Sequence, residues 1–495
     1  MLFADLIRRM PDFVALPPKA VDAWQAAALA GGNLIGITAD SREVRHGMIF
    51  AALPGLRADG RRFIASAVAR GASAVLAPLD TGWPAGVPLR PLLGDAEPRR
   101  RMALIAALFA DPAPATLVAV TGTNGKTSTV EFLRQIWALS GIRAASLGTL
   151  GVIGPGLEPG PGLTTPDPVA LSQALATATR AGVSHMAVEA SSHGLDQFRL
   201  DALNLAAAAF TNLTRDHLDY HRTLEAYRAV KLRLFQSLLP PHATTVASTA
   251  LEAVSLSTLR GIARRRRQNF LTVGEGGSAI DLLRAVPVAG GQVLELSADG
   301  IRHDVLLKLP GRFQADNALI AAALARVTGT AGALGLLGGL AGVRGRMELA
   351  ATLPNGAAVY VDYAHTPDAL TCVLEALRPH AAGRLHIVFG AGGDRDAGKR
   401  PLMGLAAASA DRIVVTDDNP RGEDPAAIRA AVLVGCPSAV EIGDRARAIA
   451  SAMSDLGPGD VLVVAGKGHE QGQTIGATVH PFDDAATVRA LASRP

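Results

Sequence analysis

Cysteine is nearly absent from this chain of 495 residues, which contains only Cys372 and Cys436. Two cysteines exclude a disulfide framework and a cysteine-rich metal site. Long apolar runs are also lacking, because no uncharged stretch approaches the roughly 20 residues that a membrane-spanning helix needs. The first ten residues carry an acid and two arginines and lack the apolar core of a secretory signal. We therefore expect a cytoplasmic protein that has no membrane partner.

Lysine is scarce as well, since six of the 48 basic residues are lysine and the rest are arginine. The chain uses arginine wherever any cation suffices, so its lysines are mildly enriched at places that need a small, deprotonatable amine. The net charge of +4 suits anionic small molecules as well as nucleic acid. The one dense basic run, Arg264 to Arg267, lacks interleaved aromatics and is typical of a solvated helix face. We expect small-molecule substrates and no nucleic acid.

The length is too great for a single core and predicts two to four domains. Strand-like apolar runs alternate with helical periods along the chain, which indicates an α/β protein. A Pro/Gly-rich stretch at 81–91 and a glycine-rich stretch at 327–345 are typical of domain boundaries. The sequence therefore predicts three domains, at 1–95, 96–342 and 343–495.

The stretch at 117–133, LVAVTGTNGKTSTVEFL, predicts a strand, a phosphate-binding loop and a helix. Gly122 and Gly125 allow the backbone to curl so that successive N–H groups point inward. Lys126 adds an ammonium group for the outer phosphates, and Thr127 offers a hydroxyl to Mg²⁺ at the positive end of the helix. A glycine-rich turn without function is the alternative, and we expect binding of a nucleoside triphosphate.

Acids and histidines follow two further strand-like runs. Glu189 ends the run HMAVE, and Asp216, His217 and His221 come shortly after the run at 206–210. Ligands collect at the carboxyl ends of strands in an open α/β sheet, and a carboxylate there can hold Mg²⁺ directly or through water. We expect this acid and histidine cluster to take part in the active site.

Lys231 lies in the predicted helix at 224–239, among leucines and a phenylalanine. It is either a surface lysine whose stem covers apolar residues or a buried amine whose neutral form is favoured by desolvation. The residues alone leave both possibilities open.

Four strand-like runs after residue 343 each end in charged residues. The first ends at Asp362 and His365, and the others lead into GAGGDRDAGKR, DNPR and GKGHE. This repetition indicates a doubly wound sheet with one ligand-bearing edge. Before it, Asn317 is predicted at the start of a helix, and Arg346 is a candidate cation for phosphates. GAGGDR is only a weak dinucleotide fingerprint, so we do not expect nicotinamide binding.

Nine motifs along nearly the whole chain resemble those of the Mur ligase family: TGTNGKT, LTTPDP, VEASSHGLDQFR, TRDHLDYH, the lysine of AVKLRLF, DYAHTPDAL, GGDRDAGKRPLM, DNPR and GKGHE. The resemblance implies an N-terminal domain for the UDP moiety, a central P-loop ATPase domain and a Rossmann-like C-terminal domain. It also implies that ATP activates a carboxylate as an acyl phosphate, which an amine then attacks. The motifs are most similar to those of members that add meso-2,6-diaminopimelate to UDP-N-acetylmuramoyl-L-alanyl-D-glutamate, a step of peptidoglycan precursor synthesis.

The resemblance implies a role for each matching residue, with Lys126, Lys231, His217 and Glu189 as the catalytic set. ATP would be bound by Gly122, Thr123, Asn124, Gly125, Lys126, Thr127, Ser128, Asn317, Arg346 and Asp362. Thr127 and Glu189 would hold one Mg²⁺, and His217 and a carbamylated Lys231 would hold a second. The UDP-sugar dipeptide would be bound by Ala39, Ser41, Leu56, Arg57, Ala58, Thr164, Thr165, Ser191, Gln197 and Arg199. Diaminopimelate would be bound by Arg395, Asp418, Asn419, Pro420, Arg421, Gly466 and Glu470.

Two of these implications have a chemical rationale in the residue types. Carbon dioxide adds only to a neutral amine and gives an anionic metal ligand, so the resemblance favours a buried Lys231. Diaminopimelate carries a second amino-acid centre at its far end. Arg421 suits its carboxylate, and Glu470 suits its ammonium.

Two alternatives remain beside this interpretation. A lysine-adding, folylpolyglutamate-type or other Mur-type amide ligase would share the phosphate loop but is not expected to carry both DNPR and GKGHE. A regulatory P-loop ATPase would leave the charged C-terminal loops without a role. We expect a monomer.

Overall fold

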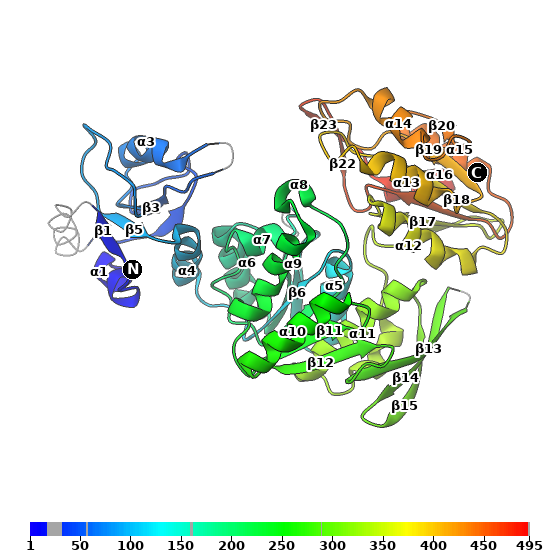
Figure 1. Cartoon of the computed structure of the whole chain (residues 1–495), viewed down its shortest axis with the longest axis horizontal. Helices are drawn as coiled ribbons and strands as arrows, with labels where there is room; N and C mark the ends of the chain where they lie inside the picture. Colours follow the sequence, from blue (N-terminus) through cyan, green and yellow to red (C-terminus); the bar gives the residue numbers. More distant parts are fainter. Residues whose placement is uncertain (17–31, 56–57, 159–161, 289, 494–495) are drawn as a thin grey trace. The chain divides into compact units, whose positions relative to one another are not determined.

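The computed structural model describes residues 1–16, 32–55, 58–158, 162–288 and 290–493 (Figure 1). The chain falls into two compact units, one formed by 1–117 with 147–205 and the other by 118–146 with 206–495. Both units are mixed α/β, as the sequence predicts. In the described part of the chain no helix has the length and apolar character needed to cross a membrane.

The first unit begins with a five-stranded sheet in the order β1-β5-β4-β3-β2. β1 is antiparallel to β5, and the other neighbours are parallel. Successive residues of β3 enter different cores: Ile49 packs with α1 and α4, and Phe50 packs with α3. The elements are α1 (Phe3–Arg9), β1 (Val14–Leu16), β2 (Gly36–Thr38), β3 (Met48–Ala51), η2 (Gly60–Phe63), α3 (Ile64–Ala69), β4 (Ala74–Pro78), β5 (Leu92–Asp95) and α4 (Pro98–Ala110).

The largest sheet has ten strands in the order β15-β14-β13-β12-β11-β10-β6-β9-β7-β8. The pairs from β6 through β10, β11 and β12 to β13 are parallel, and β13, β14 and β15 form antiparallel hairpins. Its elements before residue 240 are β6 (Thr116–Thr121), α5 (Lys126–Leu139), β7 (Ala144–Gly148), β8 (Gly151–Ile153), α6 (Pro168–Arg180), β9 (His185–Glu189), α7 (Ser192–Asp196), β10 (Ala207–Phe210), α8 (Leu218–His221), α9 (Leu224–Arg233) and the π-helical turn η3 (Leu234–Leu238). The later ones are β11 (Thr244–Ser248), α10 (Ala253–Arg266), β12 (Asn269–Gly274), β13 (Ile280–Val288), β14 (Gly291–Ala298), β15 (Ile301–Leu307), α11 (Arg312–Val327) and η4 (Ala333–Gly339).

Local sequence explains where several helices begin. Asp167 caps α6 by accepting hydrogen bonds from the N–H groups of Val169 and Ala170, and a proline follows it in the first turn. Thr366 caps α12 (Pro367–Leu377) and Asp424 caps α14 (Pro425–Leu433) in the same way, each before a proline. The TPDP, HTPD and EDP segments are therefore helix starts.

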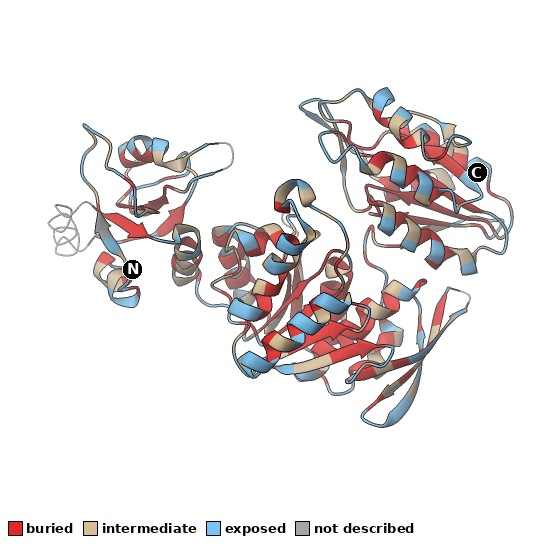
Figure 2. Cartoon of the chain, in the orientation of Figure 1, coloured by how far each residue is buried: buried red, intermediate tan, exposed pale blue. Residues whose placement is uncertain are grey.

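The C-terminal sheet of the second unit has six strands in the order β16-β17-β21-β18-β19-β20. All neighbours are parallel except the β16–β17 pair. The central strands are buried on both faces, which explains their continuous apolar runs (Figure 2). The elements are β16 (Glu348–Thr352), β17 (Ala358–Asp362), α12 (Pro367–Leu377), η5 (Arg378–His380), β18 (Leu385–Phe389), α13 (Lys399–Ala407), β19 (Arg412–Val415), α14 (Pro425–Leu433), β20 (Val440–Glu441), α15 (Arg445–Ser454), β21 (Val461–Ala465), β22 (Gly472–Ile475), β23 (Thr478–Pro481) and α16 (Asp484–Ala492).

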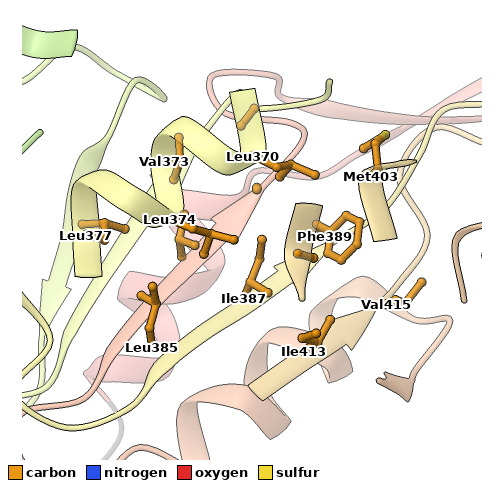
Figure 3. Packing of buried hydrophobic residues seen from close by; sticks show 14 of the residues in the cluster. Leu370, Val373, Leu374, Leu377, Leu385, Ile387, Phe389, Met403, Ile413 and Val415 are labelled. Carbon is orange, nitrogen blue, oxygen red and sulfur yellow. The ribbon is translucent and has the colours of Figure 1, made fainter. Parts of the chain in front are cut away.

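Helices cover both faces of this sheet. On one face Leu370 and Leu374 of α12 and Met403 of α13 pack on Ile387 and Phe389 of β18 (Figure 3). On the other face α15 and α16 pack on Val388 and Val464 through a second apolar cluster. The doubly wound arrangement predicted for this part of the chain is confirmed. One local prediction was wrong: α11 begins at Arg312, so Asn317 lies in its second turn rather than at its start.

Candidate active site

The phosphate loop joins β6 to α5 as the sequence predicts, and residues that follow β10 hold it from the side. The Thr211 hydroxyl donates to the Asn124 carbonyl at 2.6 Å, and the Asn124 N–H donates to Asn212 Oδ1 at 2.9 Å. The Thr123 hydroxyl accepts from the Thr214 N–H at 3.0 Å. These bonds fix the loop against the end of the neighbouring strand.

Both loop glycines are required by close neighbours. Gly122 has φ +150° and Gly125 has φ +84°, in the region that favours glycine. A Cβ atom on Gly122 would lie 1.8 Å from Thr211 Oγ1, and one on Gly125 would lie 2.2 Å from Asn317 Oδ1. Asn317, predicted as a nucleotide residue, therefore lies against the loop from α11.

Two lysine amines meet at one carbonyl of this loop. Lys126 Nζ donates to the carbonyls of Gly122 at 3.0 Å and Thr123 at 2.8 Å, and Lys231 Nζ donates to Gly122 at 2.7 Å. Lys231 is 1% exposed, so the buried alternative is the correct one. Burial and the nearby Lys126 charge hold the pKa of Lys231 well below its usual value. The neutral amine is thereby favoured.

Tyr227, Asp216 and His217 surround this pair. Lys231 Nζ lies 4.4 Å from the centre of the Tyr227 ring, and Tyr227 Oη donates to Thr123 Oγ1 at 3.4 Å. His217 Nε2 lies 3.4 Å from Asp216 Oδ2, and the His217 backbone is left-handed at φ +54°. Burial acts to raise the pKa of Asp216, but the His217 and His365 charges outweigh it and lower the pKa. The predicted acid and histidine cluster thus lies in the same unit as the phosphate loop.

Arg346 and Asp362 form the other wall of this region. Arg346 Nη2 donates to Thr127 Oγ1 at 3.4 Å, and its guanidinium lies 4.4 Å from the Tyr363 ring centre. Its Nε is buried and has no hydrogen-bond partner within the described residues. Asp362 accepts from the N–H groups of Met347 at 2.6 Å and Ala364 at 2.7 Å, while burial raises its pKa against the opposing Arg346 charge. Of the remaining predicted nucleotide residues, Ser128 is buried in the first turn of α5.

In the first unit, Glu189 lies at the end of β9 within a network of threonines. Its carboxylate accepts from the Thr149 N–H at 2.8 Å and from the Thr149 hydroxyl at 3.2 Å. That hydroxyl shares a 2.9 Å hydrogen bond with Thr164, and the Thr165 hydroxyl donates to the Glu189 carbonyl at 2.7 Å. Glu189 is 1% exposed, so the network holds a buried carboxylate.

The other predicted dipeptide residues of this unit extend the network. Arg199 Nη1 donates to the Thr165 carbonyl at 2.6 Å, and its Nη2 donates to Gln197 Oε1 at 2.7 Å. The Ser191 N–H donates to Thr165 Oγ1 at 3.0 Å. Thr165 is thus hydrogen-bonded to three other predicted residues, Glu189, Ser191 and Arg199.

The predicted residues before position 60 lie on two other loops of the first unit. Ala39 and Ser41 follow β2 in a turn where the Asp40 carboxylate accepts from the Arg42 N–H at 2.9 Å. Ala58 is exposed, and its carbonyl accepts from the Gly55 N–H at 3.0 Å. Leu56 and Arg57 lie outside the described residues.

The loops predicted to bind the incoming amino acid are tied together in the C-terminal sheet. Asn419 Nδ2 donates to Glu470 Oε2 at 2.9 Å, and the buried Lys467 amine donates to both Asn419 Oδ1 and Glu470 Oε2 at 3.0 Å. Arg421, at φ +51°, donates from Nη1 to the Gly393 carbonyl at 2.8 Å. These contacts join the segments after β18, β19 and β21.

Four further predicted residues belong to these loops. A Cβ atom on Gly466 would lie 2.6 Å from Asp418 Oδ2, so the two loops approach closely. Burial raises the pKa of Asp418, opposed by the Arg445 and Lys467 charges. Pro420 is buried, and Arg395 is exposed on the loop after β18.

Some residues that shape the site were not predicted from the sequence. Thr211 and Asn212 follow β10 directly, and the strand-end rule applied to Glu189 and Asp362 would have found them. The contacts of Tyr227 and Lys467 depend on how separate segments fold together, and no sequence signal indicates them.

A metal-ion site made only of protein ligands is not evident in the described residues, which contain no group of three His, Cys, Asp or Glu side chains able to hold an ion. Mg²⁺ typically takes one or two protein ligands, with phosphate and water completing its shell. The single carboxylate of Glu189 and the hydroxyl of Thr127 are ligand types that Mg²⁺ accepts. The residues present therefore fit Mg²⁺ only together with a phosphate-bearing substrate.

Three segments of the chain match known protein families. Residues 33–84 match the Mur ligase family catalytic domain, 120–325 the Mur ligase middle domain, and 345–468 the Mur ligase glutamate ligase domain.

Full-length relatives and solved structures agree with these matches. The UDP-N-acetylmuramoyl-L-alanyl-D-glutamate–2,6-diaminopimelate ligase of Caulobacter vibrioides is 52% identical over 92% of this chain and 95% of its own length. A solved structure of a ligase with the same name is 35% identical, has a TM-score of 0.67, and is matched over 93% of this chain and 94% of its own. The MurF ligase of Thermotoga maritima in complex with ADP has the same fold, with 20% identity and a TM-score of 0.61 over 88% of this chain and 94% of its own.

Proposed function

Because the chain belongs to the Mur ligase family, we propose that it joins meso-2,6-diaminopimelate to UDP-N-acetylmuramoyl-L-alanyl-D-glutamate at the expense of ATP. The observation that carries this proposal is the 52% identity to the Caulobacter vibrioides ligase along 92% of the chain. The proposed reaction serves peptidoglycan precursor synthesis, and its substrates are small molecules. We further propose that the enzyme works as a monomer in the cytoplasm.

We propose three functional domains, at 1–95, 96–342 and 343–495, for the UDP moiety, ATP and the amino acid. Each of the three family matches falls within a different one of these domains. These domains are defined by the substrate that each would bind, whereas the two compact units are defined by contacts within the chain. The two divisions therefore need not coincide.

The phosphate loop is the proposed ATP site, and the structure offers two observations that fit a nucleotide there. The spaces at Gly122 and Gly125 admit no side chain, so glycine is needed for the tightly curled backbone of a phosphate-binding loop. The buried Nε of Arg346 has no partner among the described residues, and an anion would supply one. Lys126, Thr127, Asn317 and the neighbouring loop residues would complete the site.

Two Mg²⁺ ions are proposed to neutralise phosphate charge during in-line transfer, which is the chemistry that they supply when bound. Thr127 and Glu189 are proposed for the first ion, and His217 with carbamylated Lys231 for the second. Thr127 and Glu189 belong to different compact units, and their pairing stays a prediction. The support for Lys231 is its burial, which lowers the pKa of its amine and so favours the neutral form. A carbamate forms when a neutral amine bonds to carbon dioxide and releases a proton.

The proposed reaction has two steps. A carboxylate oxygen of the dipeptide bonds to the γ-phosphorus of ATP while the bond to the leaving ADP oxygen breaks. The diaminopimelate amine then bonds to the acyl carbon and loses a proton, and phosphate leaves. Lys126 and Arg346 supply positive charge for the transferred group, and Thr164, Thr165, Ser191, Gln197 and Arg199 orient the dipeptide from the first unit.

Selection of the amino acid is proposed to rest on Arg421 and Glu470. Arg421 would pair with the distal carboxylate of diaminopimelate, and lysine would leave that guanidinium unpaired. Glu470 would accept from the distal ammonium, and Asn419 already holds its carboxylate in place. Arg395, Asp418, Pro420 and Gly466 would form the rest of this pocket.

A substrate-dependence assay tests the function. The protein is incubated with ATP, Mg²⁺ and the UDP-sugar dipeptide, and phosphate release is measured with diaminopimelate, with L-lysine and with neither. We expect release only with diaminopimelate and a product mass increased by one diaminopimelyl residue. Release with lysine would instead identify a lysine-adding ligase. Release without any amino acid would identify a regulatory ATPase and overturn the proposal.

A further inference from the structure

Arg445 and Asp484 form an ion pair that is completely enclosed in the C-terminal sheet domain. Arg445 Nε donates to Asp484 Oδ1 and its Nη2 donates to Oδ2, both at 2.7 Å. The two side chains are 1% and 0% exposed. A buried ion pair loses the hydration of both charges and is weak evidence for stability by itself. Its additional contacts therefore indicate what it does.

The remaining hydrogen bonds of Arg445 go to the end of β21 and to the segment just after β19. Its Nη2 donates to the carbonyl of Ala465 at 2.9 Å, and its Nη1 donates to the carbonyl of Asp417 at 3.5 Å. Ala465 is the last residue of β21, directly before Gly466, and Asp417 directly precedes Asp418.

β19 and β21 are not neighbours in the sheet. β18 lies between β21 and β19 in the sheet. Arg445 therefore links the segments that end β21 and follow β19, on either side of β18. The charge of the Arg445 guanidinium also opposes the rise in the pKa of Asp418 that burial causes. Two loops proposed to grip one amino acid thus share one cationic anchor.

We propose that Arg445, held by Asp484, is a positioning residue that sets the spacing between the 418–421 loop and the 466–470 loop for diaminopimelate. The inference rests on the proposed function, because the loops are assigned to diaminopimelate there. Arg445 itself does not touch the substrate. Its planar fork serves the carboxylate and the Ala465 carbonyl together, and a lysine at this position could not reproduce that geometry.

The test uses full-length variants and compares Michaelis constants for each substrate. Asp484→Asn and Arg445→Lys weaken the anchor, and the double variant Arg445→Met with Asp484→Leu removes both charges so that no unpaired charge stays buried. We expect the KM for diaminopimelate to rise about tenfold or more in all three. The KM for ATP and the KM for the UDP-sugar dipeptide should change less than about twofold.

Asp460→Asn is the matched control. Asp460 is buried directly before the amino end of β21, where it accepts from His386 Nε2 at 3.1 Å and from the Arg384 N–H at 2.6 Å. We expect this variant to lose thermal stability without a selective rise in the KM for diaminopimelate. Should the double variant fail to fold, Arg445→Lys and Asp484→Asn give the same comparison.

Two results would overturn the inference. One is an unchanged KM for diaminopimelate in all folded anchor variants, and the other is an equal rise in every KM, matched by Asp460→Asn. Either result is read against the wild-type enzyme. If the wild-type enzyme shows no diaminopimelate-dependent turnover, the proposed function has failed rather than the anchor.

Discussion

The amine of Lys231 lies 2.7 Å from the carbonyl oxygen of Gly122, the same oxygen that accepts from Lys126 at 3.0 Å. Two ammonium groups so close together in a buried place repel each other, and the more deeply buried one loses its charge more readily. Burial and the Lys126 charge therefore lower the pKa of Lys231 and favour its neutral form beside the proposed phosphate site.

Replacement of Lys231 by arginine should reduce turnover about a thousandfold or more, although the positive charge is kept. A guanidinium cannot form a carbamate, and it stays charged where the pocket favours a neutral group. The measurement is the initial rate of phosphate release with all three substrates present. Lys308→Arg, at an exposed position, serves as the control and should behave as wild type. Near-normal turnover of Lys231→Arg would remove the carbamate from the mechanism.

Replacement of Gly125 by alanine should weaken ATP binding by about tenfold to a hundredfold. The added Cβ would lie 2.2 Å from Asn317 Oδ1, so the loop or α11 must shift. Binding of a fluorescent ATP analogue, measured by titration, reports the loss. Gly141→Ala is a close control, because Gly141 has φ +85° just after the same helix but no atom within 4 Å of the added Cβ. Equal affinities for the two variants would argue against the loop as the nucleotide site.

Replacement of Arg421 by alanine should raise the KM for diaminopimelate by about tenfold to a hundredfold and leave the KM for ATP nearly unchanged. The reason is the loss of the guanidinium proposed to pair with the distal carboxylate. The preference for diaminopimelate over lysine should fall by a similar factor. Steady-state kinetics with each amino acid measure both effects, and Arg412→Ala on the exposed start of β19 is the control. Unchanged discrimination would dismiss Arg421 as the selective residue.

Replacement of Thr165 by valine should raise the KM for the UDP-sugar dipeptide by about tenfold. The Thr165 hydroxyl donates to the Glu189 carbonyl and accepts from the Ser191 N–H, so valine would remove a hydrogen-bond partner from a buried carbonyl and from a part-buried N–H group. Kinetics with varied dipeptide provide the measurement. Thr179→Val is the control, because the Thr179 hydroxyl donates to the Leu175 carbonyl within its own helix. A dipeptide KM equal to that of the control would contradict the assignment.

The phosphate loop and the C-terminal sheet were predictable because their patterns are local. A strand, a glycine turn and a helix follow one another at 117–133, and four apolar runs each end in charge. Parallel strands place their carboxyl ends together, so strand-end residues such as Asp362 could be grouped before any contact was known. The burial of Lys231 could not be predicted from the residues alone, because leucines beside a lysine suit either a covered stem or an enclosed amine. The resemblance to a family indicated the correct alternative.

Contacts between distant segments were not predictable. Arg445 reaches Asp484 across 39 positions, and Tyr227 reaches Thr123 across 104. Neither sits in a motif with a fixed spacing, and an arginine beside an aspartate cap in sequence is typical of any exposed helix start. The start of α11 was predicted too late because Gly311 and Arg312 carry no side-chain cap signal. Long-range pairing of this kind is decided by packing rather than by local pattern.

The acid sensitivity of the C-terminal part of the chain should depend on His469. Burial, followed by the Arg346 charge, lowers the pKa of His469 to about 4. Between the unfolded pKa near 6.5 and about 4, the unfolded chain binds a proton that the folded chain refuses, so acidification favours unfolding. The free energy of unfolding should therefore fall as the pH drops below about 6.5, and this contribution should level off below about 4.

His469→Gln removes the titrating group and should reduce that loss of stability by at most about 2 kcal/mol between pH 7 and pH 5. Urea unfolding monitored by Trp and Tyr fluorescence at both pH values gives the comparison. His303→Gln, on the half-buried middle of β15, is the control for loss of a histidine elsewhere in the chain. The same pH dependence in wild type and His469→Gln would show that His469 is protonated in the folded enzyme. In that case a neighbouring anion would have to screen the Arg346 charge from the His469 ring. Glu470 is the residue to replace next, because its charge raises the pKa of His469.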